Sequence, residues 1–207
     1  DYSRHHQVHF IFASSGGAIY GEAHLGPQDE NHSEFPQNPY GVAKLSIDRY
    51  LHAFNHQYGL TYTSMRFSNV YGPRQGLLGE AGVVSVFMGR AMASKPLTVN
   101  GDGLQTRDFV YVMDLARLGP TLALKRPVGV FNLATGVETT ILELATKIRT
   151  AFGQEEAIQH APANNGEQRR SVLSSAKAMQ ILRWTPETKL DQGLAQTRDW
   201  FRAYPSA

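Results

Sequence analysis

The sequence contains no cysteine. This absence excludes disulfide-bonded scaffolds, thiolate zinc sites and cysteine nucleophiles, so any chemistry must use oxygen and nitrogen groups. It also fits a reducing compartment, and we expect a cytoplasmic protein. Long hydrophobic runs are missing too: no window approaches the roughly 18 apolar residues of a membrane span, and residues 1–6 lack the basic and apolar regions of a signal peptide. We therefore expect no membrane association.

A strong charge of either sign is also absent. The 20 basic and 18 acidic residues give a formal net charge of +2 and are spread evenly, so we expect no nucleic-acid surface. The eight histidines form no metal-binding pattern. His52 and His56 share a helix face, but the glutamate of an HExxH zinc motif is not between them, and we predict no metal site.

What is present is the composition of an ordinary globular protein, with 42% hydrophobic residues in a chain of 207. That length permits one large or two small domains. Apolar periodicity and turn residues predict strands at 8–13, 61–67, 97–99, 107–111 and 128–133, helices at 39–57, 83–94, 114–124, 141–152, 174–182 and 190–203, and a long loop at 68–82. The order of strand, helix and strand over residues 8–67 is typical of a doubly wound sheet, so the predicted class is α/β.

Two side chains on the first long predicted helix have a spacing that suits proton transfer. Tyr40 and Lys44 are four residues apart and therefore share one helix face. An ammonium close to a phenol favours the phenolate, which makes Tyr40 a candidate general base. Alone, such a pair is more often part of an amphipathic surface. Here the strand at 8–13 runs into Ser14-Ser15-Gly16-Gly17, at the carboxyl edge where open α/β sheets bind ligands.

Several segments, taken in order, resemble a known family. They are SSGGAIYG at 14–21, PYGVAK at 39–44, RFSNVYGPRQ at 66–75, GEAGVV at 79–84, NGDG at 100–103, RDFVYV at 107–112, FNLATG at 131–136 and WTP at 184–186. In this combination the chain resembles the extended short-chain dehydrogenases/reductases that act on nucleotide sugars, and within them the group of UDP-glucose 4-epimerases. The likeness covers nearly the whole chain, and several independent segments are far more specific than one.

The resemblance implies a fold and a set of ligands. Residues 1–75 and 108–140 would form the C-terminal part of a doubly wound, parallel Rossmann-type sheet that binds NAD. Residues 76–107 and 141–207 would form a smaller α/β substrate domain. The implied ligands are NAD and a UDP-sugar, and the implied assembly is a homodimer.

Roles for individual residues follow from the same resemblance. The implied catalytic residues are Tyr40 as the base, Lys44 as its partner on the nicotinamide ribose, and Ser15 as a hydrogen-bond partner of the sugar hydroxyl. The implied cofactor-binding residues are Ser14, Tyr40, Lys44 and Phe67. The implied substrate-binding residues are Asn69, Val83, Thr98, Asn100, Arg107 and Glu167. The implied reaction is epimerisation through a transient 4-keto sugar.

The turn after the first strand departs from the family pattern. Related enzymes often place the hydroxyl partner of the tyrosine one or three residues after Ser15, where this sequence has Gly16 and Ala18. Sugar 4,6-dehydratases have Thr-Asp-Glu at residues 16–18, and without these carboxylates water loss is disfavoured relative to epimerisation or simple oxidoreduction. The alternatives that stay open are a reductase or dehydratase of the same family, a uronate epimerase, and a nucleotide-sugar-binding protein without chemistry.

The expected contacts to the diphosphate also raise alternatives. The guanidinium fork of Arg107 suits phosphate oxygens, but an ion pair with Asp102 or Asp108 is the competing interpretation. Where the family has an arginine followed by Pro-Gly and an acid, this sequence has Asn164. A neutral amide supplies no charge. We therefore expect that the diphosphate is bound less tightly, or that the arginines at 169 and 170 bind it instead.

A glycine-rich dinucleotide fingerprint is the element of the family that we do not find. Gly76, Gly79 and Gly82 have the spacing GxxGxxG, but they follow a loop rather than a first strand, so we reject the match. In the family the fingerprint precedes the segment that begins here near residue 8. The resemblance therefore implies a truncated chain that hardly holds an NAD site, and the activity of this chain alone stays an open question.

Overall fold

The computed structural model describes residues 2–76 and 82–204 and has an α/β fold. In chain order the elements are α1 (Tyr2–His5), β1 (Phe10–Ser15), α2 (Gly16–Tyr20), α3 (Pro39–Tyr58), β2 (Tyr62–Phe67), β3 (Asn69–Tyr71), α4 (Val83–Met92), β4 (Thr98–Asn100), β5 (Thr106–Tyr111), α5 (Val112–Ala116), α6 (Gly119–Lys125), β6 (Gly129–Leu133), β7 (Glu138–Thr140), α7 (Ile141–Phe152), β8 (Gln159–Ala161), the π-helix η1 (Ala178–Leu182) and α8 (Leu190–Ala203). None of the helices in the described part has the length and apolar character that crossing a membrane requires.

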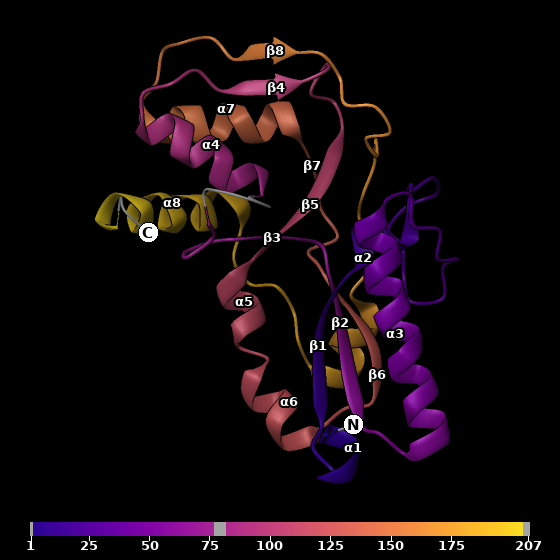
Figure 1. The fold of residues 1–207 in the computed structure, drawn as a ribbon. Helices are drawn as coiled ribbons and strands as arrows, with labels where there is room; N and C mark the ends of the chain where they lie inside the picture. Colours follow the sequence, from indigo (N-terminus) through magenta and orange to yellow (C-terminus); the bar gives the residue numbers. More distant parts are fainter. Residues whose placement is uncertain (1, 77–81, 205–207) are drawn as a thin grey trace.

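Three small sheets carry these strands (Figure 1). The first has the order β1-β2-β6 and is parallel throughout, with Phe10 opposite Tyr62 and Thr63 opposite Gly129. The second has the order β3-β5-β7, in which β3 and β5 are parallel and β5 and β7 antiparallel. The third pairs β4 with β8 in parallel. In Figure 1, β5 and β7 lie above the level of β3, between the first sheet and the helices α4 and α7, and so connect the two ends of the molecule.

Helix α3 has start and stop signals that explain its predicted position. The Asn38 side chain accepts a hydrogen bond from the backbone N–H of Gly41 at 2.8 Å, and Pro39 occupies the first turn. Gly59 ends the helix with a φ of 69°, a left-handed conformation that costs glycine little. Leu51 on α3 packs with Leu60 and Tyr62, so the helix covers one face of the first sheet.

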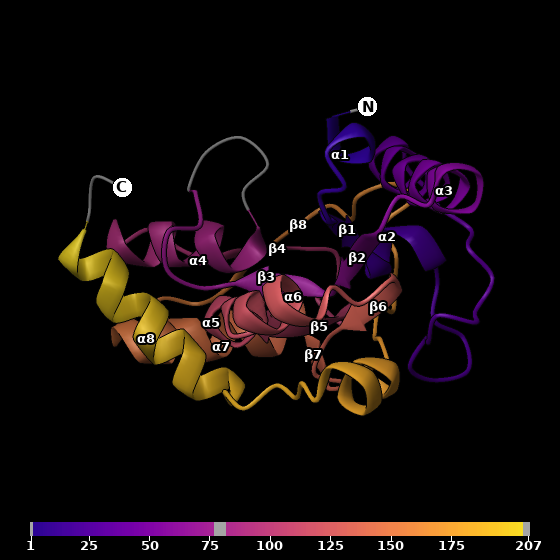
Figure 2. The same ribbon diagram turned by 90° about the horizontal axis from the view of Figure 1, so that it is seen from below.

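The other face of the first sheet is covered by α6 and η1 (Figure 2). Leu122 of α6 and Leu182 of η1 pack against Phe131 and Leu133 of β6. β2 and β6 are largely buried, whereas β1 at the edge of the sheet leaves Phe10 and Ile11 37% and 43% exposed. A second core gathers α4, α7 and α8 around Tyr71 and Phe109 at the other end of the molecule.

The secondary structure corrects several predictions. The predicted loop at 68–82 contains the strand β3, and the turn after β1 is the short helix α2. The single helix predicted at 114–124 is divided into α5 and α6. The strands β7 and β8 were not predicted, because three residues carry too little periodicity. Residues 79–81 of the GEAGVV segment and Gly79 of the rejected glycine pattern lie outside the described residues.

A buried ion pair fixes α3 against the first sheet. Arg66 on β2 and Asp48 on α3 are only 2% and 3% exposed, and the Arg66 Nε lies 2.8 Å from the Asp48 Oδ2. The same carboxylate accepts hydrogen bonds from the hydroxyls of Ser14 and Ser64. Asp48 therefore joins the helix to β1 and β2 at once.

The rest of the Arg66 guanidinium reaches α2 and the segment before α3. Its Nη1 donates to the Tyr20 hydroxyl at 2.9 Å, and its Nη2 donates to the Glu34 carboxylate at 2.6 Å. Tyr20 in turn donates to the Asn132 side chain on β6 at 2.9 Å. Burial raises the pKa of Tyr20 to about 12, so the phenol stays protonated and keeps this donor. A single arginine thus connects all three strands of the sheet with two helices.

We expect Asp48→Ala to lower the free energy of unfolding by about 3–5 kcal/mol, because it leaves the buried Arg66 charge without its partner. Urea unfolding measures the loss. Asp199→Ala is the matched control, since Asp199 forms an exposed pair with its neighbour Arg198 and should cost about 1 kcal/mol at most. Equal losses in the two variants would contradict the role given to Asp48.

Candidate active site

A cleft of about 500 Å³, here called the first cleft, opens at the carboxyl ends of β1 and β2. Ligands bind at this edge in open α/β sheets. Its lining residues include Ser14 and Ser15 from the end of β1, Phe67 from the end of β2, and Tyr40 from the first turn of α3. These four were predicted from sequence, and the structure brings them together.

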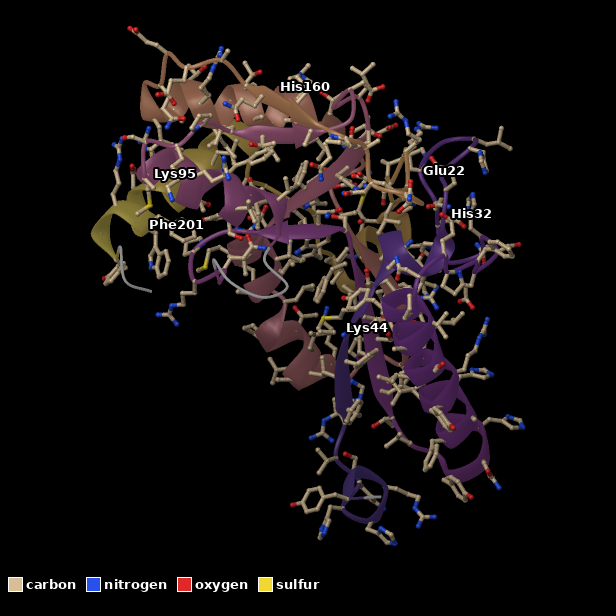
Figure 3. All side chains as sticks on the ribbon, turned by 45° about the horizontal axis from the view of Figure 1, so that its top comes forward. Glu22, His32, Lys44, Lys95, His160 and Phe201 are labelled. Carbon is tan, nitrogen blue, oxygen red and sulfur yellow. The ribbon has the colours of Figure 1, made fainter. Side chains whose placement is uncertain are left out.

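Tyr40 and Lys44 have the arrangement that their spacing predicted. Tyr40 is 48% exposed and lines the first cleft. The Lys44 Nζ lies 5.5 Å from the centre of the Tyr40 ring and donates a hydrogen bond to the Ala13 carbonyl at 2.9 Å. Lys44 itself is not among the lining residues of the first cleft, although its ammonium contacts both the Tyr40 ring and the Ala13 carbonyl. Figure 3 labels Lys44.

The two serines at the end of β1 differ in what they can offer a ligand. Ser14 is 3% exposed, and its hydroxyl donates to Asp48 at 3.3 Å, so it serves the buried Arg66 network. Within residues 2–76 and 82–204 the Ser15 hydroxyl has no hydrogen-bond partner and is free to meet a ligand in the cleft.

The glycines after Ser15 are explained by close packing. A Cβ built on Gly16 would lie 2.4 Å from the Leu173 Cδ1, and a Cβ on Gly17 would lie 2.7 Å from the Ser171 Oγ. Both distances are far inside van der Waals contact. A larger residue at position 16 or 17 would therefore require the Leu173 or the Ser171 side chain to move.

A second cleft of about 350 Å³ adjoins the first. All six predicted substrate-binding residues line it: Asn69, Val83, Thr98, Asn100, Arg107 and Glu167. Asn69, Arg107 and Glu167 also line the first cleft, so the two share a wall. The structure thus brings together residues from three strands, one helix and the segment after β8.

Arg107 lies where the two clefts meet. Its side chain is 15% exposed, and its Nη1 donates to the carbonyls of Thr106 and Gln168, both at 2.8 Å. Its Nη2 lies 3.4 Å from the Glu167 carboxylate. Burial lowers the pKa of the Arg107 guanidinium, because its surroundings solvate the charge poorly. An anion placed in the cleft would relieve this cost.

The competing ion pairs considered for Arg107 are wrong. Asp102 binds Arg169 instead, at 2.9 and 3.1 Å. Asp108 is fully buried and accepts hydrogen bonds from the backbone N–H groups of Thr135 and Gly136, at 3.0 and 2.8 Å. Both carboxylates are therefore engaged elsewhere. Glu167 is the ion-pair partner of Arg107, and Glu22 acts on its charge from a distance.

No arginine takes over the charge that Asn164 lacks. Asn164 lines the second cleft and donates to Glu167 at 3.3 Å. Arg169 pairs with Asp102 and Arg170 with Glu138, and neither lines a cleft. Among the described lining residues of both clefts, Arg107 is the only cation.

Other lining residues escaped the sequence analysis. Gln37 and Asn38 precede α3, Ser68 follows β2, and Gln168 and Ser171 follow β8. None belongs to a spacing pattern that singles it out, and only the folded chain brings them to the cleft. Residues 2–76 and 82–204 contain no group of three or more histidine, aspartate or glutamate side chains that could hold a metal ion.

Comparisons with known proteins agree with this geometry. The family described as "NAD dependent epimerase/dehydratase family" matches residues 1–134. A UDP-glucose 4-epimerase of Mycolicibacterium smegmatis is 36% identical over 197 residues, which cover 93% of this chain and 62% of the relative. The UDP-glucose 4-epimerase of Thermotoga maritima, solved with UDP-glucose, superposes with a TM-score of 0.94 at 40% identity and covers 99% of this chain and 67% of its own.

A second solved structure has the same fold. The UDP-glucose 4-epimerase of Thermus thermophilus, in complex with NAD, gives a TM-score of 0.88 at 38% identity and covers 98% of this chain and 67% of its own. The chain spans 62% of the length of the Mycolicibacterium smegmatis relative and also 62% of a putative UDP-glucose 4-epimerase of Methanocaldococcus jannaschii, to which it is 42% identical. The predicted α/β class with Rossmann-type parallel strands is confirmed. Since the family match covers more than half of the sequence, the chain belongs to the NAD dependent epimerase/dehydratase family.

Proposed function

We propose that this chain carries the substrate site and the catalytic tyrosine of an NAD-dependent epimerase that interconverts UDP-glucose and UDP-galactose. The observation that carries the proposal is the joining of the two clefts through Asn69, Arg107 and Glu167. This wall places a candidate phosphate-binding arginine between a candidate base and a polar second cleft. Solved relatives that contain UDP-glucose and NAD support the same ligands.

In this proposal the nucleotide lies in the second cleft. Arg107 contacts the diphosphate, because a half-buried guanidinium gains most from a charged partner. Asn69 assists at the phosphates, and Thr98 and Asn100 on β4 face the uracil edge. Val83 supplies an apolar contact and Glu167 a hydrogen-bond acceptor. The proposed substrate domain is residues 76–107 and 141–207, and residues 1–75 and 108–140 form the remainder of the cofactor domain.

The sugar lies in the first cleft, where Tyr40 accepts the proton of its 4-hydroxyl. The Lys44 ammonium favours the phenolate of Tyr40 during this transfer, and the Ser15 hydroxyl holds the sugar oxygen. The reaction passes through a transient 4-keto sugar that must turn over, which a cleft of about 500 Å³ permits. No other ionisable group from α3 lines this cleft.

The residues at the strand ends fit one end of an NAD molecule. Lys44 uses one of its three N–H donors on the Ala13 carbonyl, which leaves two for the hydroxyls of a ribose. Ser14 and Phe67 lie at the carboxyl ends of neighbouring parallel strands, beside Tyr40. When bound, NAD supplies the hydride acceptor and donor for carbon 4 of the sugar.

Two observations favour epimerisation of a neutral hexose over the other reactions of the family. Gly17 and Ala18 line the first cleft where a dehydratase needs carboxylates, which disfavours water loss. Apart from Arg107 and Glu167, the described lining of the first cleft is uncharged, so the carboxylate of a uronic acid finds no second cation there. A neutral hexose is therefore the favoured sugar. The homodimer stays a prediction, as does a cytoplasmic location.

We expect Arg107→Ala to weaken UDP binding by about 10- to 100-fold, because hydrogen bonds to charged groups contribute about 1.5–3 kcal/mol. Isothermal titration with UDP measures the dissociation constant. Arg90→Ala is the matched control: Arg90 is also half-buried and donates to a backbone carbonyl, that of Pro96, but it lines neither cleft. Unchanged affinity in Arg107→Ala would show that the diphosphate lies elsewhere.

In the complete epimerase, we expect Tyr40→Phe to lower turnover of UDP-galactose by about 10²–10⁴-fold, the usual contribution of a general base, while UDP affinity stays the same. Proton NMR in the presence of NAD follows the formation of UDP-glucose. Tyr50→Phe is the control, since this tyrosine lies on the same helix, is 67% exposed and does not line the cleft. Near-normal turnover in Tyr40→Phe would refute the assignment, and a reduced or dehydrated product from the unsubstituted protein would refute the epimerase.

A further inference from the structure

The first cleft has two walls that come from segments far apart in the sequence. One wall is α2 and the turn that follows it, with Gly17, Ala18 and Gly21. The other is the segment after β8, with Glu167 and Gln168 among its residues. Within the described lining of the first cleft, one hydrogen bond joins these walls, from the Gln168 side-chain amide to the Gly21 carbonyl. A second connection lies just outside the cleft.

That connection is made by Glu22, which follows the turn at Gly21. Its Oε2 accepts the backbone N–H of Arg169 at 2.9 Å, and its Oε1 accepts the backbone N–H of Arg170 at 2.6 Å. A carboxylate bound by two successive N–H groups makes charge-assisted hydrogen bonds, which are stronger than neutral ones. In Figure 3 Glu22 lies where the loop after α2 approaches the segment after β8.

Neighbouring contacts reinforce this junction, here called the Glu22 clip. The Ala23 N–H donates to the Arg170 carbonyl at 3.2 Å, and the Arg170 Nη1 donates back to the Ala23 carbonyl at 3.2 Å. The Gln168 side-chain amide donates to the Gly21 carbonyl. Because the guanidinium groups of Arg169 and Arg170 pair with Asp102 and Glu138, the Glu22 carboxylate is left to the backbone.

The other side of the same segment is held by β5. The Arg107 Nη1 donates to the Gln168 carbonyl at 2.8 Å, and the Thr106 N–H donates to the Arg169 carbonyl at 2.8 Å. Residues 168–170 therefore lie between Glu22 and β5, with Arg107 bound directly to them. A shift of this segment would move both the Arg107 guanidinium and the Glu167 carboxylate.

We propose that Glu22 is a positioning residue of the nucleotide-sugar site. Its carboxylate sets the distance between the two walls of the first cleft and, through residues 168–170, the place of Arg107. This inference rests on the proposed function, because the ligand whose affinity it controls is a UDP-sugar. Glu22 lines neither cleft; it holds the segment to which Arg107 donates, and its charge acts on the Arg107 guanidinium from a distance.

Glu30 provides a matched control within the same loop. Its Oε1 accepts one backbone N–H, that of Asn132 on β6, at 2.7 Å. Like Glu22 it ties the loop after α2 to a distant segment, but neither Glu30 nor Asn132 lines a cleft. Alanine at either position removes a carboxylate from backbone donors, so a general loss of stability would affect both variants alike.

The experiment measures UDP affinity by isothermal titration and amide exchange of the ligand-free chain by NMR or mass spectrometry. We expect Glu22→Ala to weaken UDP binding by about tenfold and to speed exchange at the amides of Arg169 and Arg170. Glu22→Gln keeps an acceptor oxygen and should recover part of the affinity. Glu30→Ala should bind UDP like the unsubstituted chain and speed exchange at Asn132 instead.

The outcomes separate the clip from the proposed function. Unchanged UDP affinity in Glu22→Ala, or an equal loss in Glu30→Ala, would overturn the positioning role. Unchanged exchange at Arg169 and Arg170 would overturn the clip itself. A third outcome separates the two proposals: the unsubstituted chain binds no UDP, but Glu22→Ala still speeds exchange at these two amides. That result would support the Glu22 clip and contradict the proposed nucleotide site.

Discussion

The position of α3 depends on the burial of one charged pair, Arg66 with Asp48. Tyr40, Lys44 and Asp48 follow one another at intervals of four residues and therefore lie along one side of α3. Asp48 accepts from Ser14 while Lys44 donates to the preceding carbonyl, that of Ala13. The end of β1 is thus fixed against the helix at two successive residues. Burying these charges costs desolvation energy, but the pair holds α3, and with it Tyr40, in one position relative to the strand ends.

Charged residues are also few in the lining of the two clefts. Arg107 and Glu167 are the charged residues that their described linings share, and they lie 3.4 Å apart at the nearest atoms. Such a wall is close to neutral, although a diphosphate is strongly anionic. The Asn164 amide adds no charge, so in the proposed function the affinity for the diphosphate depends on how well Arg107 is placed and desolvated. Its two bonds to backbone carbonyls fix its orientation before any ligand arrives. The positions of residues 106 and 168 then matter as much as the arginine itself.

Sequence reasoning succeeded where local signals decide the structure. The cap at Asn38, the proline after it and Gly59 mark both ends of α3, and the YxxxK spacing places Tyr40 and Lys44 on one face. It failed where distant contacts decide. The pair of Asp48 and Arg66 is separated by 18 residues, and Glu22 and Arg169 by 147, distances over which no periodicity connects two polar residues. The strands β7 and β8 form only because β5 and β4 lie beside them. Every predicted site residue lies in or beside a cleft, but no sequence pattern indicated the residues that hold them there.

Gly16 and Gly17 show how packing and chemistry depend on each other at this site. The side chains of Leu173 and Ser171 lie close to these glycines. A Cβ built at Gly16 would be 2.4 Å from Leu173, and one built at Gly17 would be 2.7 Å from Ser171. A side chain at either place would meet the Leu173 or the Ser171 side chain, which would have to move. A carboxylate at residue 17 would also add negative charge to a cleft with a single cation among its described lining residues. The two glycines thus allow the side chains of Leu173 and Ser171 to lie close to α2.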